Sequence, residues 1–403
     1  MPINIRKYIL LFIGFFLLLY SENIDVSSSM KISQLWKMPL IVFLVYYLFQ
    51  YRKKLSPDWT RVSYWLSLKH LINGQLCKSV VSNIQDGITF LFLPLLYNFF
   101  QNVLNKTTMR KCLLCVSQFF ILTNIPFLFF GMESNQREKH YGSFQAFSGI
   151  FQNQHAMSII MGICILVLLH YFRCGAFRDK AAKAYNMFLI VLGAYAMYAG
   201  FARTGWLMCV IGVCILFFPK GLQARQWAGI VLIGVALCGG FSYMMMTNKA
   251  FHDRVLDINS ATGQRKELGS GRGRLMENAF ELYVSGNCFE MACGYSMAGL
   301  KEYEKEKTGQ PLFAHNGFVT LLVTDGAIGM LLELLSMFLL LRFIVRRRTC
   351  PAYRLSIATW MMNVSFQMTQ GGHIFHYDLL YAMIYCLLQF EYEQQREMVT
   401  VNE

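Results

Sequence analysis

Charged residues are scarce in this chain of 403 residues: 15% are Asp, Glu, Lys or Arg, whereas 55% are apolar and 15% are aromatic. A water-soluble domain of this length would have to bury almost all of these apolar side chains, although a single core stops growing near this size. The composition therefore excludes a soluble fold and indicates a membrane protein.

Several motifs of soluble enzymes are also missing. The sequence has no P-loop, no Gly-x-Gly-x-x-Gly motif after a strand, no His-Glu-x-x-His motif and no internal repeat of 20 to 50 residues. Its twelve cysteines are scattered, mostly in apolar segments, without the Cys/His spacing of a zinc site. We therefore expect no nucleotide-binding fold, no metal site, no cofactor and no solenoid.

Cationic residues outnumber acidic ones, 37 to 23, which gives a formal net charge of +14. They gather in short clusters between apolar stretches, which is the positive-inside pattern of membrane proteins and does not predict a nucleic-acid partner. These clusters are Arg52, Lys53 and Lys54; Lys106, Arg110 and Lys111; Arg173, Arg178, Lys180 and Lys183; and Arg346, Arg347 and Arg348.

The apolar runs predict an all-α polytopic membrane protein with about 12 transmembrane helices. The stretch 62–81 is the weakest candidate, because Lys69, His70, Asn73 and Lys78 are costly inside a bilayer. It is included because the basic clusters at 52–61 and 106–111 should both lie in the cytoplasm, so the chain must cross the membrane an even number of times between them. The alternative is ten helices, with 62–104 folded back in the membrane. The predicted spans are 8–20, 39–51, 62–81, 87–104, 112–130, 156–172, 186–200, 205–219, 227–246, 317–341, 355–369 and 377–390.

This arrangement places both termini in the cytoplasm and one large loop, 248–314, outside. Three regions follow: N-terminal transmembrane helices (1–145), a core that contains the loop (146–345), and C-terminal helices with a cytoplasmic tail (346–403).

Two helices are expected within the loop. Apolar residues recur at helical spacing at Leu275, Met276, Ala279, Phe280 and Tyr283, which predicts an amphipathic helix that lies on the membrane or on the helix bundle. A second helix over 297–307 should end at Gly309, with Pro311 just beyond. Cys288 and Cys293 could form a disulfide, but two buried thiols are the favoured alternative.

Three stretches put a cation or an imidazole at the outer boundary. Arg203 lies in a tight turn, where a snorkelling membrane anchor is an equally good interpretation. Arg272 and Arg274 follow glycines that let the backbone approach an anion, although a solvated loop with two arginines is commoner. His315 precedes the next helix and could act as a general base or merely cap the helix.

Other polar residues carry weaker signals. His373 and His376 flank a short outer turn, and Glu333 is a mid-helix carboxylate for which a structural role is favoured. Gly326 and Gly329 are expected to permit close helix packing rather than chemistry.

In this order and at this spacing, the stretches resemble the O-antigen ligase and O-antigen polymerase family of membrane glycosyltransferases. The family's Ser-Arg-Thr-Gly-like turn corresponds to residues 202–205, its Ser-Gly-Arg motif to 270–272, and its His-Asn motif with a following Gly-x-x-Gly to 315–316 and 326–329. Residues 147–156 are similar to a further stretch that precedes a helix. Ala202 replaces the usual Ser, and Asn153 and Gln154 stand where the family has Pro-Asn.

The resemblance implies a GT-C-like, metal-independent, inverting glycosyltransferase in the bacterial inner membrane. The donor would be a glycan on undecaprenyl diphosphate at the periplasmic face, and the acceptor would be lipid A-core for a ligase or a second lipid-linked glycan for a polymerase. It also implies that Arg203 and Arg272 hold the diphosphate, with Arg274 in reserve, and that His315 positions or deprotonates the acceptor. The alternative of a different class is a polysaccharide transporter or lipid flippase.

Overall fold

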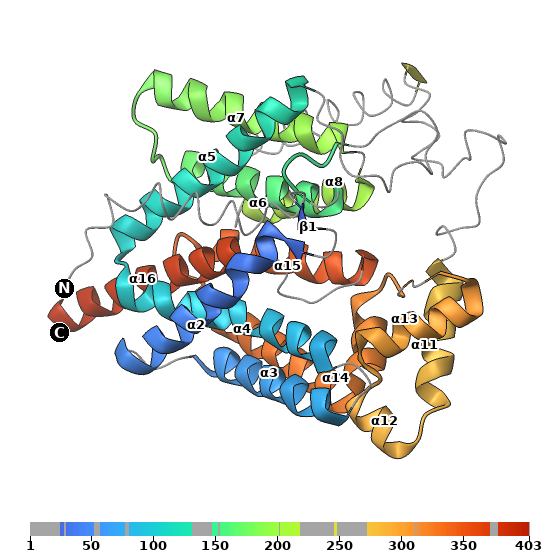
Figure 1. Ribbon diagram of the computed structural model, residues 1–403. Helices are drawn as coiled ribbons and strands as arrows, with labels where there is room; N and C mark the ends of the chain where they lie inside the picture. The colour runs from blue at the N-terminus through green and yellow to red at the C-terminus, as the bar shows by residue number, and fades with distance from the viewer. Residues whose placement is uncertain are drawn as a thin grey trace.

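The computed structural model describes most of the chain and is drawn as a ribbon in Figure 1. The described residues are 25–27, 30–51, 57–76, 80–130, 147–151, 154–200, 202–217, 246–247, 272–310, 312, 314–370 and 378–402. Predicted span 8–20 lies outside them, as does 227–246 except for its last residue.

The described part is helical, as the sequence predicted, apart from a small antiparallel pair of strands that was not foreseen, β1 (Asp25–Ser27) and β2 (Met30–Lys31). The strands are too short for period-two alternation to be visible in the sequence. Helices occupy every other predicted span that is described. They are α2 (Ile32–Tyr51), α3 (Asp58–Leu76), α4 (Val80–Val103), α5 (Lys106–Phe130), α6 (Gln154–Arg173), α7 (Lys180–Ala199), α8 (Arg203–Phe217), α14 (Gly317–Val345), α15 (Tyr353–Gln370) and α16 (Asp378–Asn402).

Three of the helices described are long and apolar enough to cross a membrane by length and composition: α5, α6 and α14. Large apolar side chains point outward from these and from other helices, among them Leu331 and Phe338 on α14 and Phe188 and Val191 on α7. Water would disfavour so much exposed apolar surface, whereas lipid accepts it. The described helices therefore have the surface of a membrane protein.

The disputed stretch 62–81 forms most of α3, which runs antiparallel to α14. Trp59 at the start of α3 lies against Phe343 near the end of α14. One turn later on α3, the Ser63 hydroxyl is 3.0 Å from that of Ser336, which lies about two turns before Phe343 on α14. Helix α4 returns beside α3, because Ser67 donates to the carbonyl of Gly87 over 2.6 Å. The two helices thus form a hairpin along α14, which both the twelve-helix arrangement and the ten-helix alternative allow.

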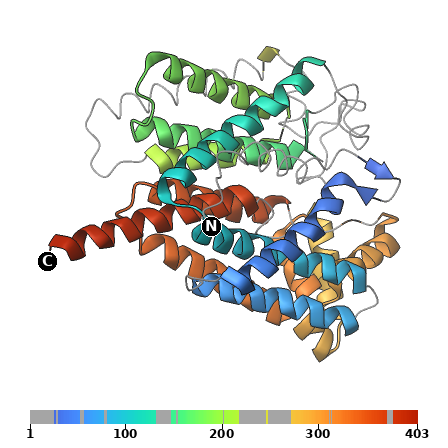
Figure 2. The ribbon, with the colours of Figure 1, turned by 60° about the vertical axis from the view of Figure 1, so that its left-hand side comes forward.

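The basic clusters among the described residues meet at one end of the bundle, which we call the basic end. There the Tyr171 hydroxyl of α6 donates to the carbonyl of Arg110 on α5, and Arg347 donates from Nε to Gln389 of α16 over 2.9 Å. The Arg347 guanidinium also lies 3.6 Å from the Phe343 ring centroid. Figures 1 and 2 show that the last turns of α16 project beyond the other helices at this end, so α16 continues past the predicted exit at 390.

Three helices cover the opposite end, which we call the loop end. These loop helices are α11 (Arg272–Val284), α12 (Cys288–Cys293) and α13 (Ser296–Thr308), and all three contact α14. Helix α13 ends at Gly309, whose φ of 78° is the left-handed cap that the sequence predicted. The bilayer surface is therefore not needed to bury the amphipathic helix, since α11 packs on the bundle.

The loop helices enclose a small core of their own. Ala279, Leu282 and Leu300 are buried there, and Met276 and Tyr283 are packed against them. Phe280, predicted to face inward, is 53% exposed instead. Because α11 contacts both α13 and α14, its buried face is not the single stripe that simple periodicity predicts.

Candidate functional site

The turn that carries Arg203 is held rigidly at the loop end. Trp206 Nε1 donates to the Met197 carbonyl over 2.7 Å, and the Trp206 ring stacks on Tyr198. A side chain at Gly205 would place its Cβ 2.3 Å from the Cβ of Ser158, so the start of α8 lies against α6 as closely as backbones allow. Arg203 is the first residue of α8, and these contacts determine where its side chain begins.

Residues 147–151 pack beside the same turn. The Phe147 amide donates to the Ala199 carbonyl over 3.0 Å, and Gly149 adopts a φ of 58°. A Cβ on Gly149 would lie 1.8 Å from Asn124 Oδ1, so a side chain there would have to displace Asn124 and adopt a strained backbone. Residues 147–151 therefore pack against the turn and help to hold its backbone in place.

Arg272 and Arg274 have different surroundings at the start of α11. Arg272 is partly buried, and its Nη1 donates to the Thr369 carbonyl at the C-terminal end of α15 over 2.8 Å. Arg274 is exposed and acts electrostatically on Glu304 of α13. The structure therefore ties Arg272, but not Arg274, to the transmembrane bundle.

The start of α14 corrects one interpretation of His315. The residue that caps the helix is Asn316, whose Oδ1 accepts from the amides of Phe318 (3.0 Å) and Val319 (3.2 Å). His315 precedes the cap with a φ of 51°, a left-handed conformation that is uncommon for a residue with a side chain. Backbone geometry of this kind persists where surrounding structure imposes it, and it often accompanies a functional role.

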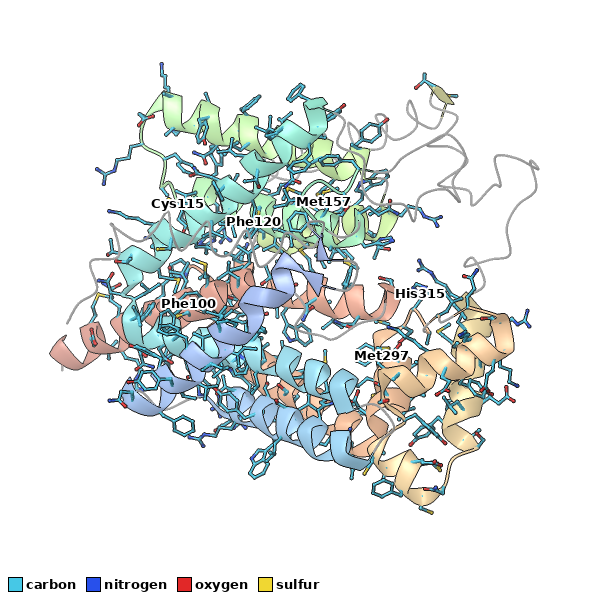
Figure 3. All side chains as sticks on the ribbon, in the orientation of Figure 1. Phe100, Cys115, Phe120, Met157, Met297 and His315 are labelled. Carbon is cyan, nitrogen blue, oxygen red and sulfur yellow. The ribbon has the colours of Figure 1, made fainter. Side chains whose placement is uncertain are left out.

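His315 and Arg272 meet at the same end of α15. Asn316 Nδ2 donates to the Met368 carbonyl over 3.4 Å, one residue before the carbonyl that accepts from Arg272. Figure 3 labels His315 beside this end of α15, between it and the loop helices. Arg272 and Asn316, the neighbour of His315, are 44 positions apart in the sequence, yet they converge on adjacent carbonyls.

Arg203 belongs to the same end because α8 runs antiparallel to α15. At the basic end, Arg173 donates to the Leu216 carbonyl near the end of α8 over 3.0 Å and also senses the charge of Arg354 at the start of α15. Midway, a Cβ on Gly212 would lie 3.0 Å from Met362 Sδ. The start of α8 must then lie beside the end of α15.

The remaining predicted residues divide into two groups. His373 and His376, like Ser270 and Gly271, lie outside the described residues. Glu333 is completely buried in α14. Cys288 and Cys293 are not joined by a disulfide, and Cys288 is exposed, so neither the disulfide nor the pair of buried thiols is correct.

A second polar cluster, which sequence reasoning did not assemble, lies about two turns into α14. The Asp325 carboxylate is completely buried; His70 Nε2 is 2.7 Å from its Oδ1 and Lys69 Nζ is 3.3 Å from the same oxygen. Thr324 Oγ1 donates to Oδ2 over 2.6 Å. We call Lys69, His70 and Asp325 the ion cluster.

The cluster adjoins a break in α14 at Gly326, where φ is 68° and ψ is −176°. The sequence did contain a signal for the ion cluster. Lys69 and His70 in one predicted span and Asp325 in another are each costly alone inside a bilayer, so they should pair. What was missing was the partner's identity, since Lys69 and Asp325 are 256 positions apart.

The part of the chain that the structure describes contains no group of three or more His, Cys, Asp or Glu side chains that could hold a metal ion. Within the described residues, the loop end offers the guanidinium groups of Arg203 and Arg272, the more exposed one of Arg274, and the imidazole of His315. Guanidinium groups bind phosphate oxygens bidentately, and imidazole exchanges a proton near neutral pH. This set can bind an anion and move a proton.

Comparison with protein families finds a match over residues 188–334 to the family described as O-Antigen ligase. The matched segment runs from α7 to the middle of α14 and so includes Arg203, Arg272, Arg274 and His315. A search of curated proteins finds no match.

Proposed function

We propose that this chain, with its O-antigen ligase domain at residues 188–334, is an inner-membrane glycosyltransferase that acts at the periplasmic face in surface-polysaccharide synthesis. The donor is a glycan on undecaprenyl diphosphate. The acceptor is lipid A-core if the protein is a ligase, or a second lipid-linked glycan if it is a polymerase. Both termini are cytoplasmic in this proposal, because the basic end carries the clustered Lys and Arg residues.

The observation that carries the proposal is the convergence at the end of α15. Arg272 and Asn316 donate to neighbouring carbonyls there, and the antiparallel packing of α8 brings Arg203 to the same level. A lipid diphosphate lies with its phosphates at a membrane boundary, so its head group would meet two guanidinium groups at that level. The N-terminus of α8 adds a favourable dipole for the anion.

The proposed reaction is a single displacement. An acceptor hydroxyl oxygen forms a bond to the anomeric carbon of the donor, while the bond from that carbon to the diphosphate oxygen breaks and undecaprenyl diphosphate leaves. The hydroxyl proton passes to His315, and configuration inverts because attack occurs opposite the leaving group. Arg203 and Arg272 stabilise the negative charge that develops on the diphosphate, with Arg274 a weaker candidate because it is exposed.

No activation by nucleotide or metal enters this scheme. The diphosphate is itself a good leaving group, and two guanidinium groups can supply the positive charge that a divalent cation supplies in other glycosyltransferases.

A transporter or flippase is the second candidate, and one observation favours it. Broken transmembrane helices and buried ionisable residues are typical of transporters, and α14 has both at Gly326 and Asp325. Against it, Asp325 is surrounded by Lys69, His70 and Thr324 rather than lying open, and the family match is to ligases.

The test is complementation of a deletion strain of the source organism, read on lipopolysaccharide gels. Unligated polymer on lipid carrier in the deletion strain identifies a ligase, and core capped with a single repeat identifies a polymerase. Accumulation of repeat units on the cytoplasmic side would instead identify a flippase. Arg203→Ala, Arg272→Ala and His315→Ala should each abolish the wild-type pattern.

Lys301→Ala is the matched control, because this exposed cation lies on the loop helix α13. It should restore the wild-type pattern. If all three site variants are present in the membrane and also restore it, the proposed site is wrong.

A further inference from the structure

The ammonium group of Lys69 joins three separate parts of the molecule. It lies on α3 and donates to two main-chain carbonyls: that of Cys293, at the end of α12, over 3.0 Å, and that of Asp325, at the break in α14. It also lies 3.3 Å from the Asp325 carboxylate. The side chain of Lys69 is only 10% exposed, so these contacts are made away from solvent.

The break in α14 explains why carbonyls are available there. The backbone at Gly326 leaves the helical region, so the carbonyls of the preceding turn lose their usual partners within the helix. One of them, at Val323, accepts from the Tyr295 amide over 2.8 Å, and another, at Asp325, accepts from Lys69. The Tyr295 amide and the Lys69 ammonium group thus supply hydrogen-bond donors to two carbonyls at the break.

The surfaces at this junction touch backbone to backbone. A Cβ on Gly294 would lie 2.3 Å from the Thr324 carbonyl oxygen, and one on Gly326 would lie 2.4 Å from that of Ala292. A Cβ on Gly329 would lie 3.1 Å from Lys69 Nζ. Contacts this close leave no room for a side chain between the loop helices and α14.

That position matters for the site. Helix α11 begins with Arg272, and its contacts with α12, α13 and α14 carry any displacement of the junction to that residue. His315, in contrast, is held directly at the start of α14. The junction therefore contributes, together with the end of α15, to the separation of Arg272 from His315.

We infer that Lys69 is a positioning residue: its ammonium group clamps the loop helices to the break in α14 and so aligns Arg272 with His315. Lys69 lies outside residues 188–334, so the site is completed by a helix beyond the matched domain. The clamp itself is independent of the proposed function, whereas its effect on catalysis rests on that function.

Two native cysteines of α12 report on the clamp. Cys293, whose carbonyl accepts from Lys69, is partly buried, and Cys288 is exposed. The experiment uses full-length protein in detergent, in two forms that retain only Cys293 or only Cys288, and measures the rate of labelling by a maleimide. Lys69→Met should raise the rate at Cys293 about tenfold, which corresponds to loss of about 1.4 kcal/mol of clamping, and leave Cys288 unchanged.

Arg61→Met is the matched control, because Arg61 lies on the same helix and is about half exposed in a surface pair with Asp58. It should change neither rate. If Lys69→Met leaves the Cys293 rate unchanged, the clamp does not exist. Where Lys69→Met does not accumulate as a monodisperse protein, Lys69→Gln, which keeps one donor group, replaces it and should give a smaller increase.

The double variant Lys69→Met/Asp325→Asn separates clamping from charge balance. If Lys69 served only to neutralise Asp325, the double variant would label at the wild-type rate, and the inference would be overturned; we expect labelling to stay fast. On lipopolysaccharide gels, Lys69→Met should give a weak pattern at normal protein abundance. A full pattern despite fast labelling would overturn the link to the site, whereas failure of wild-type protein to complement would overturn the proposed function.

Discussion

Replacing Gly326 with alanine should destabilise the protein more than replacing a left-handed glycine that has open space around it, such as Gly309. At φ 68° and ψ −176°, the backbone of Gly326 lies in a region essentially reserved for glycine, so alanine costs about 1–3 kcal/mol there. Its Cβ would also lie 2.4 Å from the Ala292 carbonyl oxygen and 2.6 Å from the Gly294 nitrogen. These are backbone atoms, so the loop helices must move.

That movement would break the bond from the Tyr295 amide to Val323 and the bond from Lys69 to Cys293. A neutral hydrogen bond contributes about 0.5–1.5 kcal/mol and one to a charged group about 1.5–3 kcal/mol. With the backbone term, the total loss is about 3 kcal/mol or more. The assay is unfolding of the purified protein in detergent, followed by circular dichroism, in parallel with maleimide labelling of Cys293.

Gly309→Ala provides the control for this prediction. Gly309 has a comparable φ of 78°, but its Cβ would meet nothing within 4 Å, so only about 1 kcal/mol should be lost. Equal losses for the two variants would refute the argument that the close contact at Gly326 fixes the loop helices.

Two further predictions concern the two ends of the bundle. Arg347→Lys should lower the unfolding free energy by about 1–2 kcal/mol. Arg347 donates hydrogen bonds to Gln389 and to the Phe343 carbonyl while its guanidinium covers the Phe343 ring, and lysine cannot make all three contacts. Arg348→Lys, at an exposed position, should have no effect in the same unfolding assay. Burial raises the pKa of Glu304 above its ordinary value of 4.5, so the folded protein holds this proton to higher pH than the unfolded chain. Stability should therefore fall as pH rises from 4.5 through the raised pKa, and Glu304→Gln should reduce that fall; an unchanged pH profile for the variant would contradict the assignment.

Hydrophobic runs predicted the helices well, because a long apolar segment has few alternatives to a membrane helix. Helix α3 needed a second argument, since Lys69 and His70 weaken its apolar character, and the parity of the basic clusters supplied it. The reason that α3 tolerates these residues could not be read from the sequence: their partner, Asp325, is brought to them by the fold.

The site shows a similar division. The order of the motifs led to Arg203, Arg272 and His315, but spacing alone could not say which residue caps α14 or that Arg272 reaches α15 while Arg274 stays exposed. Gly326 was expected to allow packing within a continuous helix, because a glycine that breaks a helix looks the same in sequence as one that merely narrows it. Phe280 was misplaced because α11 has two neighbours and not one.

The ion cluster also bears on how such proteins can be recombined. Asp325 belongs to the matched segment, but the lysine and histidine that balance its charge come from α3, which lies before it in the chain. A chimera that exchanged residues 188–334 alone would pair a buried carboxylate from one parent with an unrelated helix from the other. A chimera that keeps this charge balance must therefore take α3 and α14 from the same parent protein.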